Sequence, residues 1–191
     1  MTRPDTLTFV TGNAGKVEEL RALLDPLGIA VVPDDRGYPE IQHDELAGVA
    51  EAGAGYLLAT GLEPPFLLED SGLFVSALKG FPGVYSRHAL DTIGVQGILD
   101  LLRDVELESR TAAFRTHLLY VDEGRGLHRF EGTCKGRIAE RPAGDGGFGF
   151  DPVFIPDGHE RTFAELGTEA KNGLSHRGQA TRAFAAWLAN Q

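Results

Sequence analysis

The amino-acid sequence predicts an α/β protein with a mixed central sheet. Residues 7–32 contain a strand, a loop, a helix and a second strand in that order, the opening unit of many α/β folds. Residues 111–138 form two strand-like runs around a short turn, a pattern that predicts antiparallel pairing. The length of 191 residues suits one domain, or two small lobes that share one core. We therefore treat residues 1–191 as a single domain.

The first elements follow from the spacing of apolar residues. Leu7–Thr11 is predicted as a short strand, and Lys16–Leu27 as a helix whose apolar side chains fall on one stripe before Gly28 ends it. Ile29–Val32 suits a second strand. Glu45–Thr60 is rich in alanine and is predicted as a helix, although each interior glycine costs about 1 kcal/mol there.

A pair of carboxylates is expected at the end of the next strand. Pro64 and Pro65 end the preceding helix, and Phe66–Leu68 is a short apolar run typical of a buried strand. Glu69 and Asp70 follow directly. In an α/β sheet, carboxylates at a strand's carboxyl end face the crevice where ligands bind.

The remaining elements are assigned from the same patterns. A strand is predicted at Leu73–Leu78, a turn at 80–83 and a helix at Ala89–Leu102. Paired antiparallel strands follow at Thr111–Val121 and Leu127–Ile138 around a turn at Asp122–Gly126, and a closing helix is predicted at Asn172–Ala189. The predicted order is β-α-β-α-β-β-α-β-β-loop-β-α.

Composition excludes several classes of protein. The formal net charge of −10 disfavours binding to nucleic-acid backbones and anionic lipids, so neither a nucleic-acid nor a membrane partner is expected. Apolar runs such as Leu118–Val121 are far shorter than the roughly 20 residues of a spanning helix. Residues 1–12 lack the segments of a secretory signal, and the single Cys134 cannot form an intrachain disulfide, so we expect a cytoplasmic protein.

The first candidate motif joins the first strand to the first helix and consists of Thr11, Gly12, Asn13, Ala14, Gly15 and Lys16. Backbone N–H groups at such a helix start, together with a lysine, are suited to binding phosphate. The motif is not a Walker A loop, because only two residues separate its glycines and Val17 follows the lysine. An ordinary strand–helix turn explains the same residues.

The second motif is Glu69–Gly72, whose carboxylates can hold Mg²⁺ or accept a proton from water. A solvated strand end is the alternative interpretation.

The third motif is the glycine-rich stretch 144–152. It contains a G-x-G-x-x-G string but opens no helix, so we reject dinucleotide binding. Phe148 and Phe150 flank a glycine there, and two such rings can grip a purine or can anchor the loop in the core.

The fourth motif lies at the start of the last predicted helix and spans Lys171–Arg177. It places cationic donors where a solvated helix start would usually carry acids. We interpret this inversion as a sign of a binding function. His176 and Arg177 can donate to O6 of hypoxanthine or xanthine, whereas adenine presents its own N6 donor at that position. Such contacts do not exclude guanine, which also carries O6.

Taken together, these segments resemble the inosine triphosphatase family, the XTP/dITP diphosphatases that remove non-canonical purine nucleotides. Five motifs occur in the order of the family, and they are Thr11–Asn13 with Lys16, Glu69–Gly72, Gly80–Ser86, Phe148–Pro152 and Ser175–Arg177. The resemblance implies a long mixed sheet flanked by helices, two lobes with the active-site cleft between them, and a homodimer. It also implies Mg²⁺-dependent hydrolysis of XTP, ITP and dITP to the monophosphate and pyrophosphate.

The resemblance assigns roles to individual residues. Asp70 would be the catalytic carboxylate and a metal ligand, and Ser71 would help to seat the substrate. The phosphates would bind at Lys16 and the loop that begins at Thr11. The residues that would hold the base and the sugar-phosphate are Phe148, Gly149, Phe150, Asp151, Lys171, His176 and Arg177.

The second metal ligand is assigned by resemblance to Glu40, with Glu45 or Glu51 as alternatives. The segment around these residues departs from the family, because no lysine occurs between Val17 and Leu78. This departure leaves a non-catalytic nucleotide sensor as an alternative function. A pyrophosphatase that acts on modified pyrimidine triphosphates is a further alternative.

Overall fold

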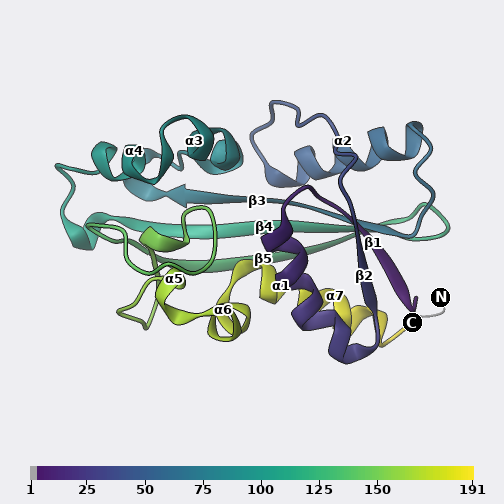
Figure 1. Cartoon of the computed structure of the whole chain (residues 1–191). Coiled ribbons are helices and arrows are strands. Elements are labelled where there is room, and N and C mark those ends of the chain that lie inside the picture. The colour runs from purple at the N-terminus through teal and green to yellow at the C-terminus, as the bar shows by residue number, and fades with distance from the viewer. Residues whose placement is uncertain (1–3) are drawn as a thin grey trace. The chain divides into compact units, whose positions relative to one another are not determined.

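The computed structural model describes residues 4–191 and contains a six-stranded sheet in the order β2-β1-β3-β4-β5-β6 (Figure 1). The strands are β1 (Thr6–Val10), β2 (Ala30–Asp34), β3 (Phe66–Val75), β4 (Thr111–Val121), β5 (Leu127–Ile138) and β6 (Phe154–Pro156). The helices are α1 (Ala14–Leu24), α2 (Leu46–Ala59), α3 (Ser86–Thr92), α4 (Gly94–Leu101), α5 (Phe163–Leu166), α6 (Thr168–Leu174) and α7 (His176–Leu188). β1 pairs in parallel with β2 and β3, whereas β5 pairs antiparallel with β6. The predicted mixed sheet with flanking helices is therefore confirmed.

The chain divides into two compact units. The described part of unit 1 comprises residues 4–70, 116–132 and 177–191, and unit 2 comprises residues 71–115 and 133–176. The strands β3, β4 and β5 each contribute residues to both units. None of the helices described between residues 4 and 191 is both long enough and apolar enough to span a bilayer.

Unit 1 has a core on each face of its strands. Successive side chains of a strand point to opposite faces, so Leu67 packs in the core that contains residues of α1 and α7, and Leu68 packs in the core that contains residues of α2. Figure 1 shows α2 on one side of these strands and α1 with α7 on the other. Both leucine side chains are fully buried. The strand that carries the predicted carboxylates is thus fixed from both sides.

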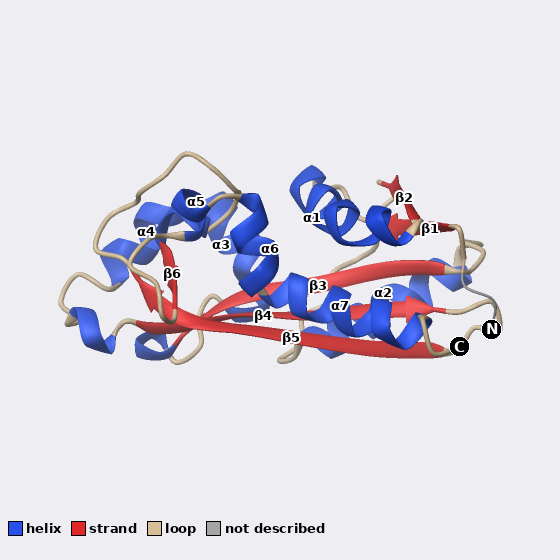
Figure 2. Cartoon of the chain, turned by 90° about the horizontal axis from the view of Figure 1, so that it is seen from below, coloured by secondary structure: helices blue, strands red, loops and turns tan. Residues whose placement is uncertain are grey.

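Unit 2 is held by a core rich in phenylalanine. Phe114, Phe154 and Phe163 pack together, with ring centroids 4.7 Å apart for the first two and 5.1 Å apart for the last two. In Figure 2, where strands are red and helices blue, β6 lies beside the helices α5 and α6 of this unit. The helix α5 begins with a capping box formed by Thr162 and Glu165, a signal that the sequence contains and that our prediction missed.

The prediction of two strands around Glu69–Gly72 is wrong, because β3 runs without interruption through this segment. Gly72 does not end the strand but allows a close contact, since a Cβ atom there would meet the carbonyl oxygen of Gly83. The next residue is held as well: the backbone N–H of Leu73 donates to Oγ of Ser86 at 2.8 Å. Glu69 and Asp70 therefore lie in the middle of a strand and not at its end.

Two predicted helices are each divided in the structure. The helix expected at 89–102 becomes α3 and α4, and Gly94, the first residue of α4, has a positive φ of 66°. The helix expected from 172 becomes α6 and α7, because Ser175 is extended and its N–H donates to the carbonyl of Lys171 at 2.7 Å. Helical spacing in the sequence continued across both breaks, so the pattern of apolar residues did not reveal them.

We expect His117 on β4 to make the stability of the protein depend on pH. Its side chain is 3% exposed, Nδ1 lies 3.4 Å from Oε1 of Glu131, and Nε2 is buried with no hydrogen-bond partner among the described residues. Burial lowers the pKa of His117, the nearby Glu131 and Glu51 oppose this shift, and Arg129 adds to it. Below the ordinary pKa of about 6.5, the unfolded chain therefore binds a proton that the folded chain resists.

We expect the free energy of unfolding to be fully retained above pH 6.5 and to fall as the pH is lowered from there, by at most about 1.4 kcal/mol per pH unit. Urea unfolding at pH 7.5 and pH 5.5 tests this, with His117→Leu expected to flatten the dependence. His88→Leu is the control, because His88 is exposed. An unchanged pH dependence in His117→Leu would refute the assignment.

Candidate functional site

The loop before α1 is shaped by its own side chains. Asn13 caps the helix, since its Oδ1 accepts from the N–H of Lys16 at 3.1 Å, and Oγ1 of Thr11 accepts from the N–H of Asn13 at 3.1 Å. These two side chains fix the backbone of the loop. The side chain of Lys16 extends to β3, where Nζ donates to the carbonyl of Glu69 at 3.4 Å and lies 3.6 Å from Oε1 of the same residue. The structure thus joins the first predicted motif to the second.

Glu69 is part of a buried network of charges. Its carboxylate accepts from Nε and Nη2 of Arg177 at 2.6 and 2.8 Å, a bidentate arrangement. Nη1 of Arg177 donates to Oε2 of Glu19 at 2.5 Å. Burial by itself lowers the pKa of Arg177, but the charges of Glu69 and Glu19 outweigh it and raise this pKa above its ordinary value. Lys16 places a second cation beside the carboxylate of Glu69.

Arg177 is therefore held in a position that the sequence did not indicate. Each of its three guanidinium nitrogens contacts a carboxylate of unit 1, and its side chain is 2% exposed. These contacts use three of the five N–H donors of its guanidinium. The sequence did not indicate Glu19, which is buried on α1 and contacts Arg177 158 residues further along the chain.

Asp70 occupies the next position on β3, so its side chain leaves the strand on the face opposite to that of Glu69. The hydroxyl of the buried Thr116 donates to the carbonyl of Asp70 at 3.2 Å. Burial raises the pKa of Tyr38 far above its ordinary value, and the charges of Asp70, Glu40 and Glu69 add to the shift in that order. Tyr38, which we did not predict, therefore lies within the electrostatic influence of all three carboxylates.

The carboxylates suit a loosely held magnesium ion and not a complete protein cage. Across residues 4–191, no group of three or more potential ligands is assembled for a metal. Mg²⁺ is usually bound by one or two carboxylates together with substrate phosphates and water, so Asp70 and one partner are sufficient. Of the three candidates for that partner, Glu51 is paired with Arg129 at 2.6 Å. The charge of Glu40, like that of Asp70, raises the pKa of Tyr38. The choice among Glu40, Glu45 and Glu51 stays a prediction.

A second group of predicted residues is assembled in unit 2. Nζ of Lys171 lies 2.5 Å from Oδ2 of Asp151, with both side chains almost fully buried, and it lies 4.3 Å from the ring centroid of Phe148. The N–H of Phe148 donates to the same Oδ2 at 2.8 Å. Gly147 is required for this arrangement, because its φ is 71° and a Cβ atom there would meet Oδ2 of Asp151. One carboxylate thus fixes both a lysine and an aromatic ring.

Of the two interpretations of Phe148 and Phe150, the burial of Phe150 favours anchoring of the loop for that ring. Phe150 is 3% exposed and belongs to the hydrophobic core of unit 2, so its ring serves to anchor the loop. Phe148 is partly exposed, and Gly149 between the two rings has a φ of 64° that turns the chain. His176 is buried as well, with its ring 4.9 Å from that of Phe114 and nearly parallel to it.

The predicted site residues thus belong to two sets. Unit 1 contains the loop at 11–16, Glu40, Asp70 and Arg177, and unit 2 contains Ser71, residues 148–151, Lys171 and His176. Within unit 1, Lys16, Glu69 and Arg177 are joined by direct contacts, and within unit 2, Phe148, Asp151 and Lys171 are joined in the same way. The cleft expected between two lobes stays a prediction.

Known proteins resemble this chain over nearly its whole length. A sequence model of the Ham1 family matches residues 7–187. A dITP/XTP pyrophosphatase of Thermococcus kodakarensis is 56% identical over 182 residues, which cover 95% of this chain and 96% of that protein. A dITP/XTP pyrophosphatase of Methanopyrus kandleri is 48% identical over 182 residues, with 95% of each chain covered. Among solved structures, a HAM1 protein from Coxiella burnetii covers 100% of both chains with a TM-score of 0.82 and 30% sequence identity.

Proposed function

The chain belongs to the Ham1 family, and from this premise we propose that it hydrolyses the non-canonical purine nucleoside triphosphates XTP, ITP and dITP to the monophosphate and pyrophosphate. The relatives named dITP/XTP pyrophosphatase, at 56% and 48% identity, support the substrate class. The observation that carries the proposal is the contact of Lys16 with Glu69, because it places a cation from the helix start beside the strand residue that precedes Asp70.

The set in unit 1 would bind and cleave the triphosphate. Lys16 lies 3.6 Å from the nearer carboxylate oxygen of Glu69, longer than a hydrogen bond, so its charge can be directed to a phosphate oxygen. The N–H groups at the start of α1 provide further donors for phosphate. Arg177 and Glu19 would act as positioning residues, since they hold the carboxylate of Glu69 through buried contacts.

Asp70 would direct the attacking water and accept its proton. The water oxygen forms a bond to the α-phosphorus, the bond from that phosphorus to the bridging oxygen breaks, and pyrophosphate leaves. Asp70 and Glu40 would hold Mg²⁺, which supplies a lowered water pKa and neutralises phosphate charge when it is bound. A carboxylate is a weak base for water, so proton transfer to Asp70 would require a water acidified by the metal.

The set in unit 2 would bind the base. A purine that stacks on Phe148 gains about 1–3 kcal/mol. Donation by Lys171 or His176 to O6 would favour hypoxanthine and xanthine, because the amino group of adenine would leave a buried donor unpaired at about 1–3 kcal/mol. These contacts do not distinguish guanine, and selection against GTP requires an additional contact near C2.

The test is pyrophosphate release from ITP and XTP against ATP and GTP, with and without Mg²⁺. We expect ITP and XTP to exceed ATP by about 10-fold or more in kcat/KM, from one unpaired donor, and chelation by EDTA to abolish turnover. Orthophosphate as the product, or equal turnover of ATP, would contradict the proposal. Tight binding of ITP without turnover would instead indicate a sensor, and faster turnover of methylated pyrimidine triphosphates or dUTP would indicate a pyrimidine pyrophosphatase.

A cytoplasmic location and a homodimer, both expected from the sequence, belong to the same proposal. Light scattering of the purified protein tests the second of these. A dimer would have twice the chain mass of 20.5 kDa. A mass that stays at that of one chain over the accessible concentration range would contradict it.

A further inference from the structure

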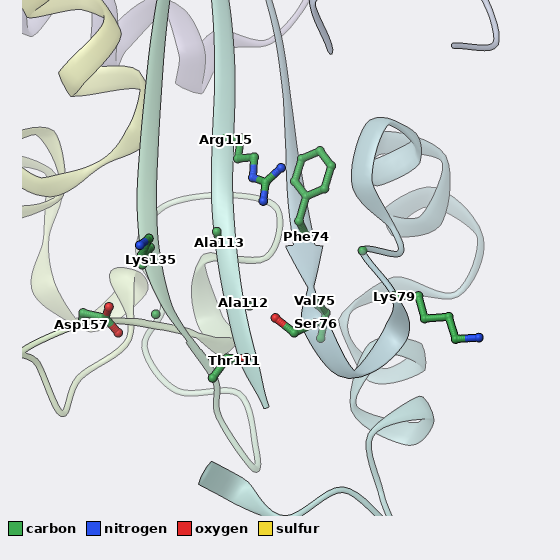
Figure 3. Close-up of a pocket in the computed structure, with 12 residues that line it drawn as sticks. Phe74, Val75, Ser76, Lys79, Thr111, Ala112, Ala113, Arg115, Lys135 and Asp157 are labelled. Carbon is green, nitrogen blue, oxygen red and sulfur yellow. The ribbon is translucent and has the colours of Figure 1, made fainter. Parts of the chain in front are cut away.

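A cavity of about 620 Å³ lies within unit 2, along the parts of β3, β4 and β5 that belong to this unit (Figure 3). Its lining includes the cations Lys79, Arg115 and Lys135, the ring of Phe74, and the carboxylate of Asp157. None of the lining residues is among the site residues predicted from the sequence. The proposed hydrolysis gives this cavity no role.

The charge of the cavity is opposite to that of the protein. Three lysine or arginine side chains and one aspartate line it, a difference of +2, whereas the whole chain has a formal net charge of −10. Among residues 4–191, none of these three cations forms an ion pair, although many exposed arginines elsewhere are paired, for example Arg87 with Asp91. Unpaired cations around one cavity attract small anions.

Arg115 is the cation with a defined position. Its guanidinium lies 4.6 Å from the centroid of the Phe74 ring, a cation–π contact that orders the long side chain. Figure 3 shows Arg115 and Phe74 directed toward one another from neighbouring strands, with Lys135 on the strand beyond Arg115. The side chain of Lys79 lies beyond Phe74 and extends away from Arg115 in this view. A guanidinium stacked on a ring keeps N–H donors at its edges, and these match the oxygens of a phosphate group.

Lys79 has an unusual backbone conformation. Lys79 follows the short helix Ser76–Leu78 in the left-handed region, with φ of 53°, where a residue with a side chain costs roughly 1–2 kcal/mol relative to the usual conformation. Gly80, which tolerates that conformation, is the next residue. Gly80 also has a positive φ, of 92°, so a cation and a glycine share this turn on the cavity wall.

We propose that this cavity binds a small phosphate-bearing anion, with Arg115 as the fixed contact and Lys79 and Lys135 as mobile ones. The volume lies within the range of about 300–1,000 Å³ typical of small-molecule sites, so it can accept a nucleoside monophosphate as well as inorganic pyrophosphate. A heterocycle would gain from stacking on the guanidinium of Arg115, which inorganic pyrophosphate cannot do.

Acetylation of lysines, followed by mass spectrometry, tests the proposal on the intact protein. The chain has lysines only at positions 16, 79, 135 and 171, and Lys79 and Lys135 are both exposed. The probes are AMP, inorganic pyrophosphate and adenosine, none of which is a triphosphate substrate. We expect AMP or pyrophosphate, but not adenosine, to slow acetylation of Lys79 and Lys135. The probe that acts at the lower concentration identifies the source as a nucleotide or as inorganic phosphate.

Two variants make the test specific. Arg115→Gln should raise the concentration needed for protection about 10-fold, since it removes a charged hydrogen-bonding group. Ala113→Trp should abolish protection of Lys79 and Lys135 altogether, because the tryptophan fills the cavity without changing its charge. Arg103→Gln, which removes an exposed charge of unit 2 outside the cavity, should behave as the wild type.

Three results would overturn the proposal. The first is that neither AMP nor pyrophosphate protects Lys79 and Lys135 from acetylation, and the second is that Arg115→Gln is protected as well as the wild type. The third is that protection increases with protein concentration when no probe is present. The last result would assign the face to contact between copies of the chain. Lys16 keeps this test separate from the proposed hydrolysis. Its protection alone supports phosphate binding in unit 1 and overturns the cavity in unit 2.

Discussion

Replacement of Asp70 by asparagine is expected to lower kcat by about 10²–10⁴-fold while the protein remains folded, the range typical of losing a general base. Asparagine has nearly the same shape but cannot accept a proton or hold a cation through a charged oxygen. The backbone at this position is fixed by β3 and by the hydroxyl of Thr116, so the substitution should leave the strand in place. Pyrophosphate release from ITP at saturating Mg²⁺ measures the effect.

The matched control is Asp35→Asn, which removes one exposed carboxylate of unit 1 and should leave kcat unchanged. Thermal unfolding of both variants shows whether the fold survives. If Asp70→Asn turns over ITP at the wild-type rate, Asp70 has no part in the reaction. If it unfolds, Asp70→Glu provides a second variant, with the charge retained and its position changed.

Replacement of Arg177 by leucine is expected to lower the free energy of unfolding by about 3–5 kcal/mol, because it leaves the carboxylates of Glu69 and Glu19 buried without their shared cation. Domains of this kind are stable by only about 5–15 kcal/mol in total. The variant should therefore unfold at a much lower urea concentration. Urea titration followed by far-ultraviolet circular dichroism measures the change.

Arg129→Leu is the control for this experiment, since it breaks a comparably short ion pair with Glu51 that is exposed on both sides. Exposed pairs contribute about 0–1 kcal/mol, so this variant should lose little. Adding Glu19→Gln to Arg177→Leu should restore part of the loss by removing one of the two buried charges that Arg177 contacts. Equal destabilisation by Arg177→Leu and Arg129→Leu would show that the network is not buried in solution.

The sequence predicted correctly those strands whose apolar and polar residues alternate within one continuous stretch. The strands expected at Thr111–Val121 and Leu127–Ile138 coincide with β4 and β5, because hydrophobic alternation and a polar turn are encoded within one stretch of sequence. The continuity of β3 was not predictable in this way, since it depends on the contact of Gly72 with Gly83. A glycine that permits close packing and a glycine that ends a strand look the same in a sequence.

The candidate site shows the same division. Lys16, Asp70 and Lys171 were found from their types and from their neighbours in the chain. Glu19 was missed because its partner Arg177 is 158 residues away, and Tyr38 was missed because only the fold brings acidic side chains near it. The burial of Phe150 could not be predicted for a related reason, since ring spacing does not reveal which of two rings is buried.

Because Glu69 and Asp70 lie on opposite faces of β3, the length of this strand is restricted when its sequence changes in evolution or by engineering. Deletion or insertion of one residue just before them would exchange the two acids, presenting the wrong carboxylate to Arg177 and withdrawing the other from Tyr38. Substitutions in this segment can be tolerated one at a time, whereas changes in its length cannot. We expect natural or engineered length variation to be confined to the loops outside Phe66–Val75.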